Sequence, residues 1–312
     1  MKLSVVATLY CSAPYIEEFY RRTTIAAQEL VGEDYEIVLV NDGSPDNSLD
    51  LTIGIAEKDP HLTLVDLSRN FGHHKAMMTG LMYSRGDRVF LIDSDLEEEP
   101  EWVIRFFEQM NRNDCDVVFG VQEQRKGGVF ERWFGQWFYL LFRILTGLTM
   151  PANPVTARLM SRRYVNALIK HDEREPFLAG ILHITGFDQR PQKINKGHSG
   201  DTTYTLWKKL ALLVDAVTSF SNAPLIAIFY VGSAIALIAC VYIVYIIFNR
   251  LLFQAPLSGW TSVIASIWLL GGLIISFTGV IGLYLSKVFL ETKKRPYTIV
   301  RQIYGKNDSS RT

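Results

Sequence analysis

The chain has 312 residues, which is long enough for one large domain or two smaller ones. Its 32 basic and 32 acidic residues balance, so no overall field favours nucleic acid or another polyanion as a partner. The three cysteines lie far apart without a CxxC spacing, which indicates buried small side chains rather than disulfides or metal ligands.

Short apolar runs alternate with segments of helical length in the first part of the chain. The predicted strands are Leu3–Leu9, Tyr35–Val40, Leu62–Leu67, Arg88–Ile92 and Asp116–Gly120. The predicted helices between them are Tyr15–Leu30, Asp46–Lys58, His73–Ser84 and Pro100–Asn111. This alternation is typical of βαβ units. It predicts an α/β domain with a mostly parallel sheet, whose binding sites lie at the carboxyl ends of the strands.

Two long stretches near the C-terminus, Pro224–Phe248 and Leu251–Ser286, contain no charged residue. A spanning helix needs about 20 apolar residues, so two transmembrane helices are predicted within residues 223–286. Basic residues outnumber acidic ones in the tail, 287–312, whereas the link Asn249–Trp260 has only one. The positive-inside rule therefore predicts a cytoplasmic tail. The N-terminus is too weakly apolar for a signal peptide, so we expect a cytoplasmic N-terminal domain on a multi-pass protein of the inner membrane.

Two further segments are apolar but interrupted by basic residues. Phe130–Leu148 is rich in aromatic residues and contains two arginines, so it is either a core helix or a helix in the membrane interface. The neighbouring predicted spans favour the interface, and residues 205–222 would form an amphipathic helix leading into the first span. Glycines in the second predicted span allow close helix approach, either to the first span or to another subunit of a homo-oligomer: Gly271, Gly272, Gly279 and Gly282.

Three carboxylates follow the fourth predicted strand at alternate positions: Asp93, Asp95 and Glu97. On an extended segment, alternate side chains point the same way and can share one cation. Oxygen ligands of this kind suit Mg²⁺ or Mn²⁺ bound beside substrate phosphates. The alternative is a solvated acidic turn that caps the next helix, because further glutamates follow.

Two other strand ends carry candidate binding residues. Asp42 follows the second strand and is placed to accept hydrogen bonds from a ligand, whereas Asp46 is more typical of a helix cap. The loop Ser68–Lys75 supplies groups that suit anionic oxygen atoms at a helix N-terminus. Its adjacent His73 and His74 do not form a convincing transition-metal site, because neighbouring histidines rarely chelate one ion.

The combination of Val40–Asp46, Ser68–Gly80, Asp93–Glu97 and two C-terminal spans resembles the membrane-bound inverting GT-A glycosyltransferases. Within them it is most similar to the polyprenyl-phosphate hexosyltransferases, such as dolichol-phosphate mannose synthase and the bacterial undecaprenyl-phosphate glucosyltransferases. The resemblance extends from Leu3 to about Tyr304. The motifs are specific in combination, although each one alone is not.

The resemblance implies a GT-A catalytic domain over residues 1–204 that transfers a hexose from a nucleotide sugar, with UDP-glucose as the default donor, to a polyprenyl phosphate in the membrane lipid. It implies that Asp42 contacts the base, Asp93 the ribose and metal, and Asp95 the metal beside the diphosphate. The other donor-binding candidates are Thr8, Tyr10, Arg69, Asn70, Lys75 and Ser94. The candidates for phosphate or acceptor binding are Arg125, Arg132, Asn153, Thr156 and Arg158, of which Arg158, with Asp95, is also a catalytic candidate.

The chain departs from the pattern of this subgroup in three places. Thr8–Ser12 replaces the usual Pro-x-Tyr-Asn-Glu pattern, and Glu97 stands where Gln is usual. Asn153–Ala157 lacks the aspartates that usually precede Arg158, one of them a proposed catalytic base. A phosphate acceptor is already mostly dianionic above pH ~6, so general-base catalysis would add little. We therefore expect Asn153 and Thr156 to orient a substrate rather than remove a proton.

Three alternatives remain open at this point. A processive polysaccharide synthase normally has more spans and a Gln-x-x-Arg-Trp motif, whereas here Val129 precedes the only Arg-Trp pair, Arg132-Trp133. A glycosyltransferase with a different acceptor would need a base that the sequence does not reveal. A pseudoenzyme that binds a nucleotide sugar or scaffolds other membrane proteins would not need the intact Asp42, Asp93 and Asp95.

Overall fold

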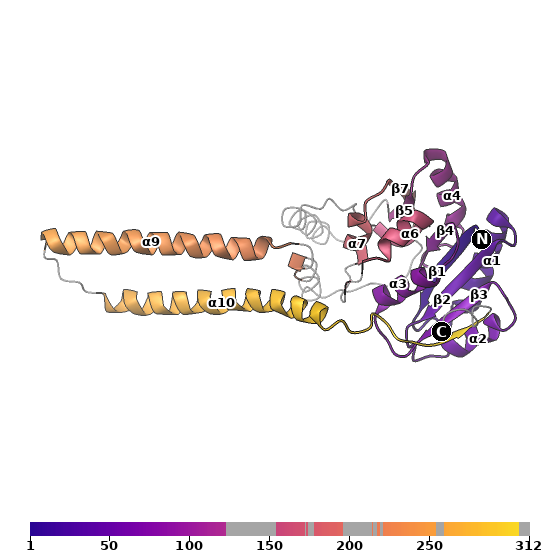
Figure 1. The fold of residues 1–312 in the computed structure, drawn as a ribbon, viewed down its shortest axis with the longest axis horizontal. Coiled ribbons are helices and arrows are strands. Elements are labelled where there is room, and N and C mark those ends of the chain that lie inside the picture. Colours follow the sequence, from indigo (N-terminus) through magenta and orange to yellow (C-terminus); the bar gives the residue numbers. More distant parts are fainter. Residues whose placement is uncertain are drawn as a thin grey trace. The chain divides into compact units, whose positions relative to one another are not determined.

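The computed structural model describes residues 1–122, 154–171, 173, 178–195, 214, 217–218, 221–253 and 259–305. The chain forms two compact units (Figure 1). The sheet unit comprises Met1–Gln136, Met150–Thr203 and Arg295–Thr312, and the helical unit comprises Trp137–Thr149 and Tyr204–Lys294. The predicted interfacial helix Phe130–Leu148 and most of 205–222 lie outside the described residues.

The sheet unit is built on an eight-stranded sheet with the order β7-β5-β6-β4-β1-β2-β3-β8. Its centre is parallel: β1 (Leu3–Leu9) pairs with β2 (Tyr35–Asn41) and β4 (Arg88–Leu91), and β2 pairs with β3 (Leu62–Leu67). Every residue of β1, β2 and β3 is buried, which explains their continuous apolar runs. These strands agree with the predicted ones to within one residue, and the α/β prediction with a mostly parallel sheet is confirmed.

The two edges of the sheet contain strands that the sequence pattern did not predict. Strand β6 (Pro154–Ser161) runs antiparallel between β4 and β5 (Val117–Gln122), and β7 (Gln189–Ile194) pairs parallel with β5. At the other edge β8 (Val300–Tyr304) pairs antiparallel with β3. The chain therefore leaves the sheet unit, forms the helical unit and returns to complete the sheet (Figure 1).

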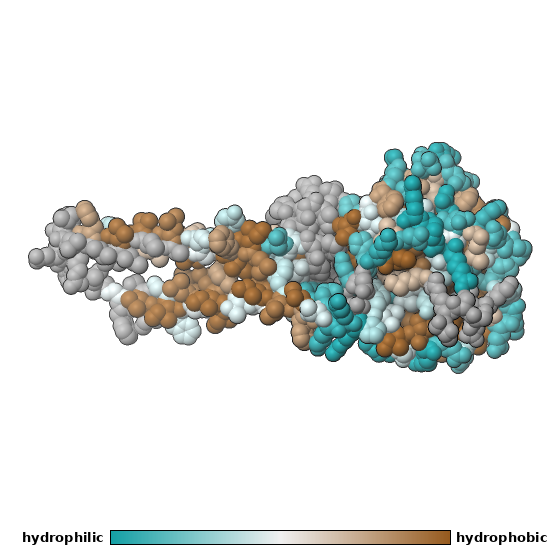
Figure 2. Space-filling model, viewed as in Figure 1, coloured by the Kyte–Doolittle hydropathy of each residue, from teal (hydrophilic) through white to brown (hydrophobic). Residues whose placement is uncertain are grey.

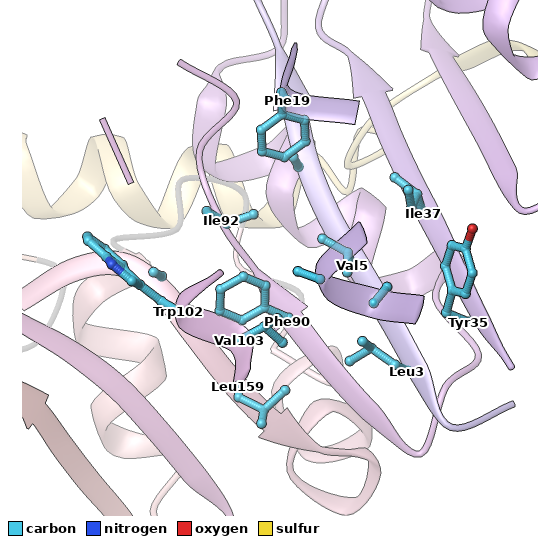
Figure 3. Packing of buried hydrophobic residues seen from close by; sticks show 14 of the residues in the cluster. Leu3, Val5, Phe19, Tyr35, Ile37, Phe90, Ile92, Trp102, Val103 and Leu159 are labelled. Atoms are coloured by element: carbon cyan, nitrogen blue, oxygen red, sulfur yellow. The ribbon is translucent and has the colours of Figure 1, made fainter. Parts of the chain in front are cut away.

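Helices pack on the sheet through their apolar faces. The first four, α1 (Ile16–Val31), α2 (Ser48–Ala56), α3 (His73–Tyr83) and α4 (Trp102–Asn113), match the predicted ones with small shifts at their ends. Two short helices, α6 (Arg162–Leu168) and α7 (Leu178–Ile184), follow β6. Figure 3 shows the core beside β1, including Phe90. The Phe90 ring meets the Phe106 ring edge to face, with centroids 5.9 Å apart.

The helical unit contains two long apolar helices, α9 (Ala223–Phe253) and α10 (Trp260–Thr292). Figure 2 shows apolar residues along the surface of α10, where Trp268 is 79% exposed and Ile275 is 74% exposed. Large exposed apolar surfaces of this kind mark contact with lipid or another protein. Within the described residues, one stretch, Ser266–Thr292, is long and apolar enough to cross a membrane, while Ala223–Ala239 forms a shorter apolar stretch in α9.

Candidate active site

Thr8 and Asp93 lie at the ends of the neighbouring parallel strands β1 and β4, and a histidine at the start of α3 joins them. The Nδ1 atom of His73, the first residue of α3, forms a 3.0 Å hydrogen bond with Thr8 Oγ1. Its Nε2 atom lies 3.2 Å from Asp93 Oδ1. The imidazole is half exposed, so it forms part of the accessible wall of this edge of the sheet. Three elements therefore meet at one polar cluster, as the carboxyl ends of parallel strands predict.

The charges around His73 favour its protonated form. Burial alone would lower the pKa of its imidazole, but the hydrogen bond to Asp93 outweighs this effect. The negative charges of Asp93, Asp42 and Asp95 act in the same direction, so the pKa of His73 is raised. The imidazole of His73 thus lies among three carboxylates that favour its protonation.

Ser94 fixes the start of the acidic loop against β1. Its hydroxyl donates a 2.7 Å hydrogen bond to the Thr8 carbonyl and lies 3.1 Å from the Ser12 hydroxyl. All three residues are buried. The sequence placed Ser94 among the donor-binding candidates, whereas its hydroxyl in this structure holds the two strand ends together.

Asp42 organises the loop between β3 and α3. Its two carboxylate oxygens accept hydrogen bonds from the amides of Phe71 (2.7 Å) and Gly72 (3.0 Å). Burial raises the pKa of Asp42, although these amide bonds and the positive charges of His73 and Arg69 oppose that shift. Each carboxylate oxygen can accept more than one hydrogen bond, so this position still permits the predicted contact with a base.

Gly43 allows this loop to lie against the end of β2. Its backbone φ is 61°, and a Cβ atom there would lie 2.6 Å from the Arg69 carbonyl carbon. A non-glycine residue would therefore be strained by its backbone and would collide with the loop. This explains why the turn after Asp42 contains glycine.

Asp46 has a structural role before α2, although the N-cap residue of that helix is Asn47. It accepts hydrogen bonds from the Ser44 and Ser48 hydroxyls, both 2.5 Å, and from the amides of Ala13 and Ser48, both 3.1 Å. Desolvation opposes ionisation, but these bonds lower the pKa of Asp46 to about 2. Its carboxylate therefore ties the turn after β2 to the segment after β1.

The acidic loop after β4 is not extended, contrary to the expectation from its alternating carboxylates. Leu96 has a left-handed backbone with φ 61°, and Asp95 Oδ1 accepts a 3.0 Å hydrogen bond from the Glu97 amide. Among the described residues, no three carboxylate, histidine or cysteine side chains gather as a metal-binding group. The shared face predicted for Asp93, Asp95 and Glu97 is therefore wrong, because the turn at Leu96 breaks the alternation.

The chemistry of Asp93 and Asp95 nevertheless fits a hard divalent cation. Mg²⁺ is commonly held by one or two carboxylates together with substrate phosphates, rather than by a complete set of protein ligands. Asp95 is exposed and Asp93 is partly exposed, so both are accessible from the edge of the sheet. Two carboxylates of this kind are sufficient for a site that a diphosphate completes.

Glu98 and Arg158 are two buried ionisable residues that bond to the backbone at the start of β6. Glu98 is fully buried, and its Oε1 atom accepts a 3.0 Å hydrogen bond from the Thr156 amide. Arg158 is 9% exposed and donates 3.0 Å bonds to the carbonyls of Thr156 and Val155. Burial lowers the pKa of Arg158, while the charges of Tyr164, Glu98 and Asp93 oppose that shift. Arg158 therefore supports the start of β6 from within the sheet unit.

The remaining candidates are distributed around this edge. Tyr10, Arg69 and Asn70 are exposed, and the Arg69 guanidinium lies 4.2 Å from the centre of the Phe71 ring. Lys75 lies in the first turn of α3 and is partly exposed. Arg125, Arg132 and Asn153 lie outside the described residues.

Sequence reasoning missed two residues of this edge. The sequence indicates His73 as part of the anion-binding loop Ser68–Lys75 but not its contacts with Thr8 and Asp93, which join residues far apart in the chain. Its place after Gly72, at the first position of a predicted helix, was the available signal. Glu98 belongs to the turn that the alternative interpretation expects to be solvated, but its side chain is fully buried.

Comparison with known proteins identifies the family. The glycosyl transferase family 2 model matches residues 4–169. A protein of Mycobacterium tuberculosis (strain CDC 1551 / Oshkosh) described as putative glycosyltransferases is 49% identical over 311 residues, covering 100% of this chain and 91% of that protein. The prophage bactoprenol glucosyl transferase homolog of Escherichia coli (strain K12) is 32% identical over 310 residues, covering 97% of this chain and 99% of that protein.

Among solved structures, residues 1–349 of S. aureus TarS in complex with UDP-GlcNAc align with a TM-score of 0.48 at 16% identity. That alignment covers 71% of this chain and 68% of the other. The family assignment follows from the matched family model and from the full-length similarity of the relatives. This chain belongs to glycosyl transferase family 2 and is a glycosyltransferase.

Proposed function

We propose that this glycosyltransferase transfers a hexose from a nucleotide sugar to a polyprenyl phosphate at the cytoplasmic face of the membrane, with inversion at the anomeric carbon. The family supports a nucleotide-sugar donor. The similarity to a bactoprenol glucosyl transferase homolog extends over 97% of this chain, so it includes the apolar helices as well as the family domain. UDP-glucose is accordingly the first donor to test.

The main observation in support of a lipid acceptor is that the chain returns to the sheet after its apolar helices. Strand β8 begins eight residues after α10 ends at Thr292, and it pairs with β3 inside the sheet unit. A catalytic domain whose own sheet is completed from beyond an apolar helix is held at a membrane surface. An acceptor that resides in the same membrane is then presented to the domain without leaving the lipid.

The same return supports two membrane crossings. Because β8 is part of the sheet, the end of α10 must lie on the same side of the membrane as β3. A chain that leaves and returns to one side crosses an even number of times, and Ser266–Thr292 accounts for one crossing. Helix α9 has 31 residues, a length of about 46 Å that exceeds the hydrocarbon core. We assign the second crossing to α9.

The proposed reaction needs position and charge neutralisation rather than a general base. An acceptor phosphate oxygen attacks the anomeric carbon, the bond to the donor diphosphate breaks, and its electron pair stays on the departing nucleoside diphosphate. No proton changes place, because the acceptor phosphate is mostly dianionic above pH ~6. The exposed Arg69 and the partly exposed Lys75 supply positive charge at this edge.

A divalent metal fits the two accessible carboxylates, Asp93 and Asp95. Mg²⁺ or Mn²⁺ bound there would neutralise the donor diphosphate and stabilise the leaving group. Asp42 would bind the nucleotide while its carboxylate keeps the Phe71 and Gly72 amides in place. Thr156, whose amide is fixed by Glu98, would orient a substrate at the start of β6.

A transfer assay with the full-length protein tests this proposal. Membranes containing the protein are incubated with undecaprenyl phosphate and a panel of nucleotide sugars labelled in the sugar. We expect label in the organic phase with one donor, and no such product with the Asp95→Asn variant. Label that enters a water-soluble polymer would instead indicate a polysaccharide synthase. If no donor in the panel is consumed, the proposed enzyme activity is wrong.

A further inference from the structure

The strand that follows the membrane helices contacts the start of the loop that carries the donor-binding candidates. Strand β8 pairs with β3 in the register Asp66 opposite Gln302 and Leu67 opposite Val300, so Arg301 is an extra residue at a bulge. A bulge of this kind redirects a side chain. The Arg301 guanidinium lies 3.2 Å from Asp66 Oδ2 and donates a 2.8 Å hydrogen bond to the Ser68 carbonyl.

The first of these contacts leads to the turn after β2. Asp66 is 1% exposed at its side chain, and its Oδ1 atom accepts a 2.8 Å hydrogen bond from the Asn41 side-chain amide. The Asn41 Oδ1 atom in turn accepts a 3.2 Å bond from the Ser44 amide. The buried side chains of Asp66 and Asn41 therefore connect Arg301 to the Ser44 amide in the turn that contains Asp42.

The second contact lies where the loop Ser68–Gly72 begins. The Ser68 amide donates a 2.9 Å bond to the Ile299 carbonyl, and its carbonyl accepts from Arg301. The hydroxyl of Thr298, the residue before Ile299, lies 2.9 Å from the Thr79 hydroxyl of α3. The tail thus fixes the loop at its start and helix α3 behind it, while Asp42 fixes the loop at Phe71 and Gly72.

We propose that Arg301 is a positioning residue for the donor-binding loop, so that the tail beyond the membrane helices is part of the donor site. This inference rests on the proposed function only for the identity of the loop as a donor site. Arg301 acts through Asp66, Asn41 and the Ser68 carbonyl, and it does not touch the substrate. Lysine cannot replace it fully, because one ammonium group lacks the planar fork that reaches two acceptors at fixed geometry.

The test compares three variants of the full-length protein. Arg301→Ala removes both contacts, and Arg301→Lys retains the charge beside Asp66. Arg21→Ala is the matched control, because Arg21 forms a surface ion pair with Glu18 and is 59% exposed, close to the 54% of Arg301. KM for the donor, KM for undecaprenyl phosphate, kcat and Tm are measured for each variant.

We expect the donor KM of Arg301→Ala to rise about fivefold to tenfold, with an acceptor KM within about twofold of the wild type. The donor KM of Arg301→Lys should lie between those of Arg301→Ala and the wild type, and the donor KM of Arg21→Ala should match the wild type. A donor KM unchanged in Arg301→Ala would overturn the inference. A parallel rise of both KM values with a lower Tm would also overturn it, because that result indicates general loss of structure.

A binding measurement separates this inference from the proposed acceptor. Titration calorimetry with UDP, GDP or TDP needs no acceptor, and the nucleotide that the wild type binds is then used for the variants. Weaker binding to Arg301→Ala supports the inference even if polyprenyl phosphate proves to be the wrong acceptor. If the wild type binds none of the three nucleotides, both the donor site and the role of Arg301 are wrong.

Discussion

Gly43 offers the sharpest structural test of the donor-side loop, through the substitution Gly43→Ala. An alanine there would adopt a left-handed conformation at φ 61°, which costs about 1–2 kcal/mol for a residue with a Cβ atom. Its Cβ would also lie 2.6 Å from the Arg69 carbonyl carbon, so the backbone of the loop must move. Backbone displacement of this kind adds about 1–3 kcal/mol.

Two other glycines separate these contributions. Gly32 has φ 62° and ψ −133° with nothing within 4 Å of the added Cβ, so Gly32→Ala should show the cost of a positive φ without a steric clash. Gly54 lies inside α2 with an ordinary backbone and open space around it. Gly54→Ala should therefore stabilise the protein by about 0.5–1 kcal/mol, as alanine does in a helix.

The assay is thermal unfolding of the full-length variants, followed by the donor KM. A change of 1 kcal/mol shifts the Tm of a domain of this size by about 2–4 °C. We expect Gly43→Ala to lower the Tm by about 10 °C and raise the donor KM about tenfold, and Gly32→Ala to lower the Tm by about 4 °C without changing the KM. If Gly43→Ala behaves like Gly32→Ala in both measurements, the close approach to Arg69 does not hold the loop.

Four further predictions concern the chemistry and the membrane topology. Asp95→Asn should remove nearly all activity and leave Tm unchanged, because asparagine can still accept the hydrogen bond from the Glu97 amide but cannot hold a hard cation. Full activity of this variant, or undiminished turnover in EDTA, would contradict the metal site. Arg158→Ala should destabilise the protein by about 1–3 kcal/mol, since it removes the bonds that the buried guanidinium donates to the Thr156 and Val155 carbonyls, whereas Thr156→Ala keeps its backbone bond and should fold normally; equal unfolding temperatures would refute this difference. The rate should rise as the acceptor phosphate ionises near pH ~6 and then stay level, whereas a rate that climbs steadily to high pH would point to a base acting on a hydroxyl acceptor. In intact cells that express the protein without its native cysteines, a membrane-impermeant thiol reagent should label the Ser258→Cys variant and not the Lys306→Cys variant. The reverse pattern would overturn the topology.

The elements with strong local patterns were predictable from the sequence. Strands β1 to β3 are buried throughout, so their apolar runs are continuous, and the helices between them have apolar faces of ordinary length. Strand β8 has no such pattern, because it is a short edge strand with exposed residues at Arg301 and Gln302. Its pairing with β3 depends on the chain returning from the helical unit, which no local signal records.

The candidate site was predictable by position more than by role. The strand ends that carry Thr8, Asp42 and Asp93 were identified, because parallel strands bring their carboxyl ends to one edge. The roles of His73 and Glu98 depend on contacts between distant parts of the chain and on burial, which composition does not reveal. The predicted alternation of side chains along the acidic loop ends at Leu96, where the backbone adopts a left-handed conformation.

The central claim is that the acceptor is a lipid phosphate, and the most direct measurement compares two acceptors that differ only in that group. The purified full-length protein is given the active nucleotide sugar with either undecaprenyl phosphate or undecaprenol, and the products are identified by mass spectrometry. We predict a lipid carrying one hexose and one phosphate from undecaprenyl phosphate, and no glycosylated undecaprenol. A hexosylated undecaprenol, or hexose transfer that does not depend on either lipid, would contradict the account.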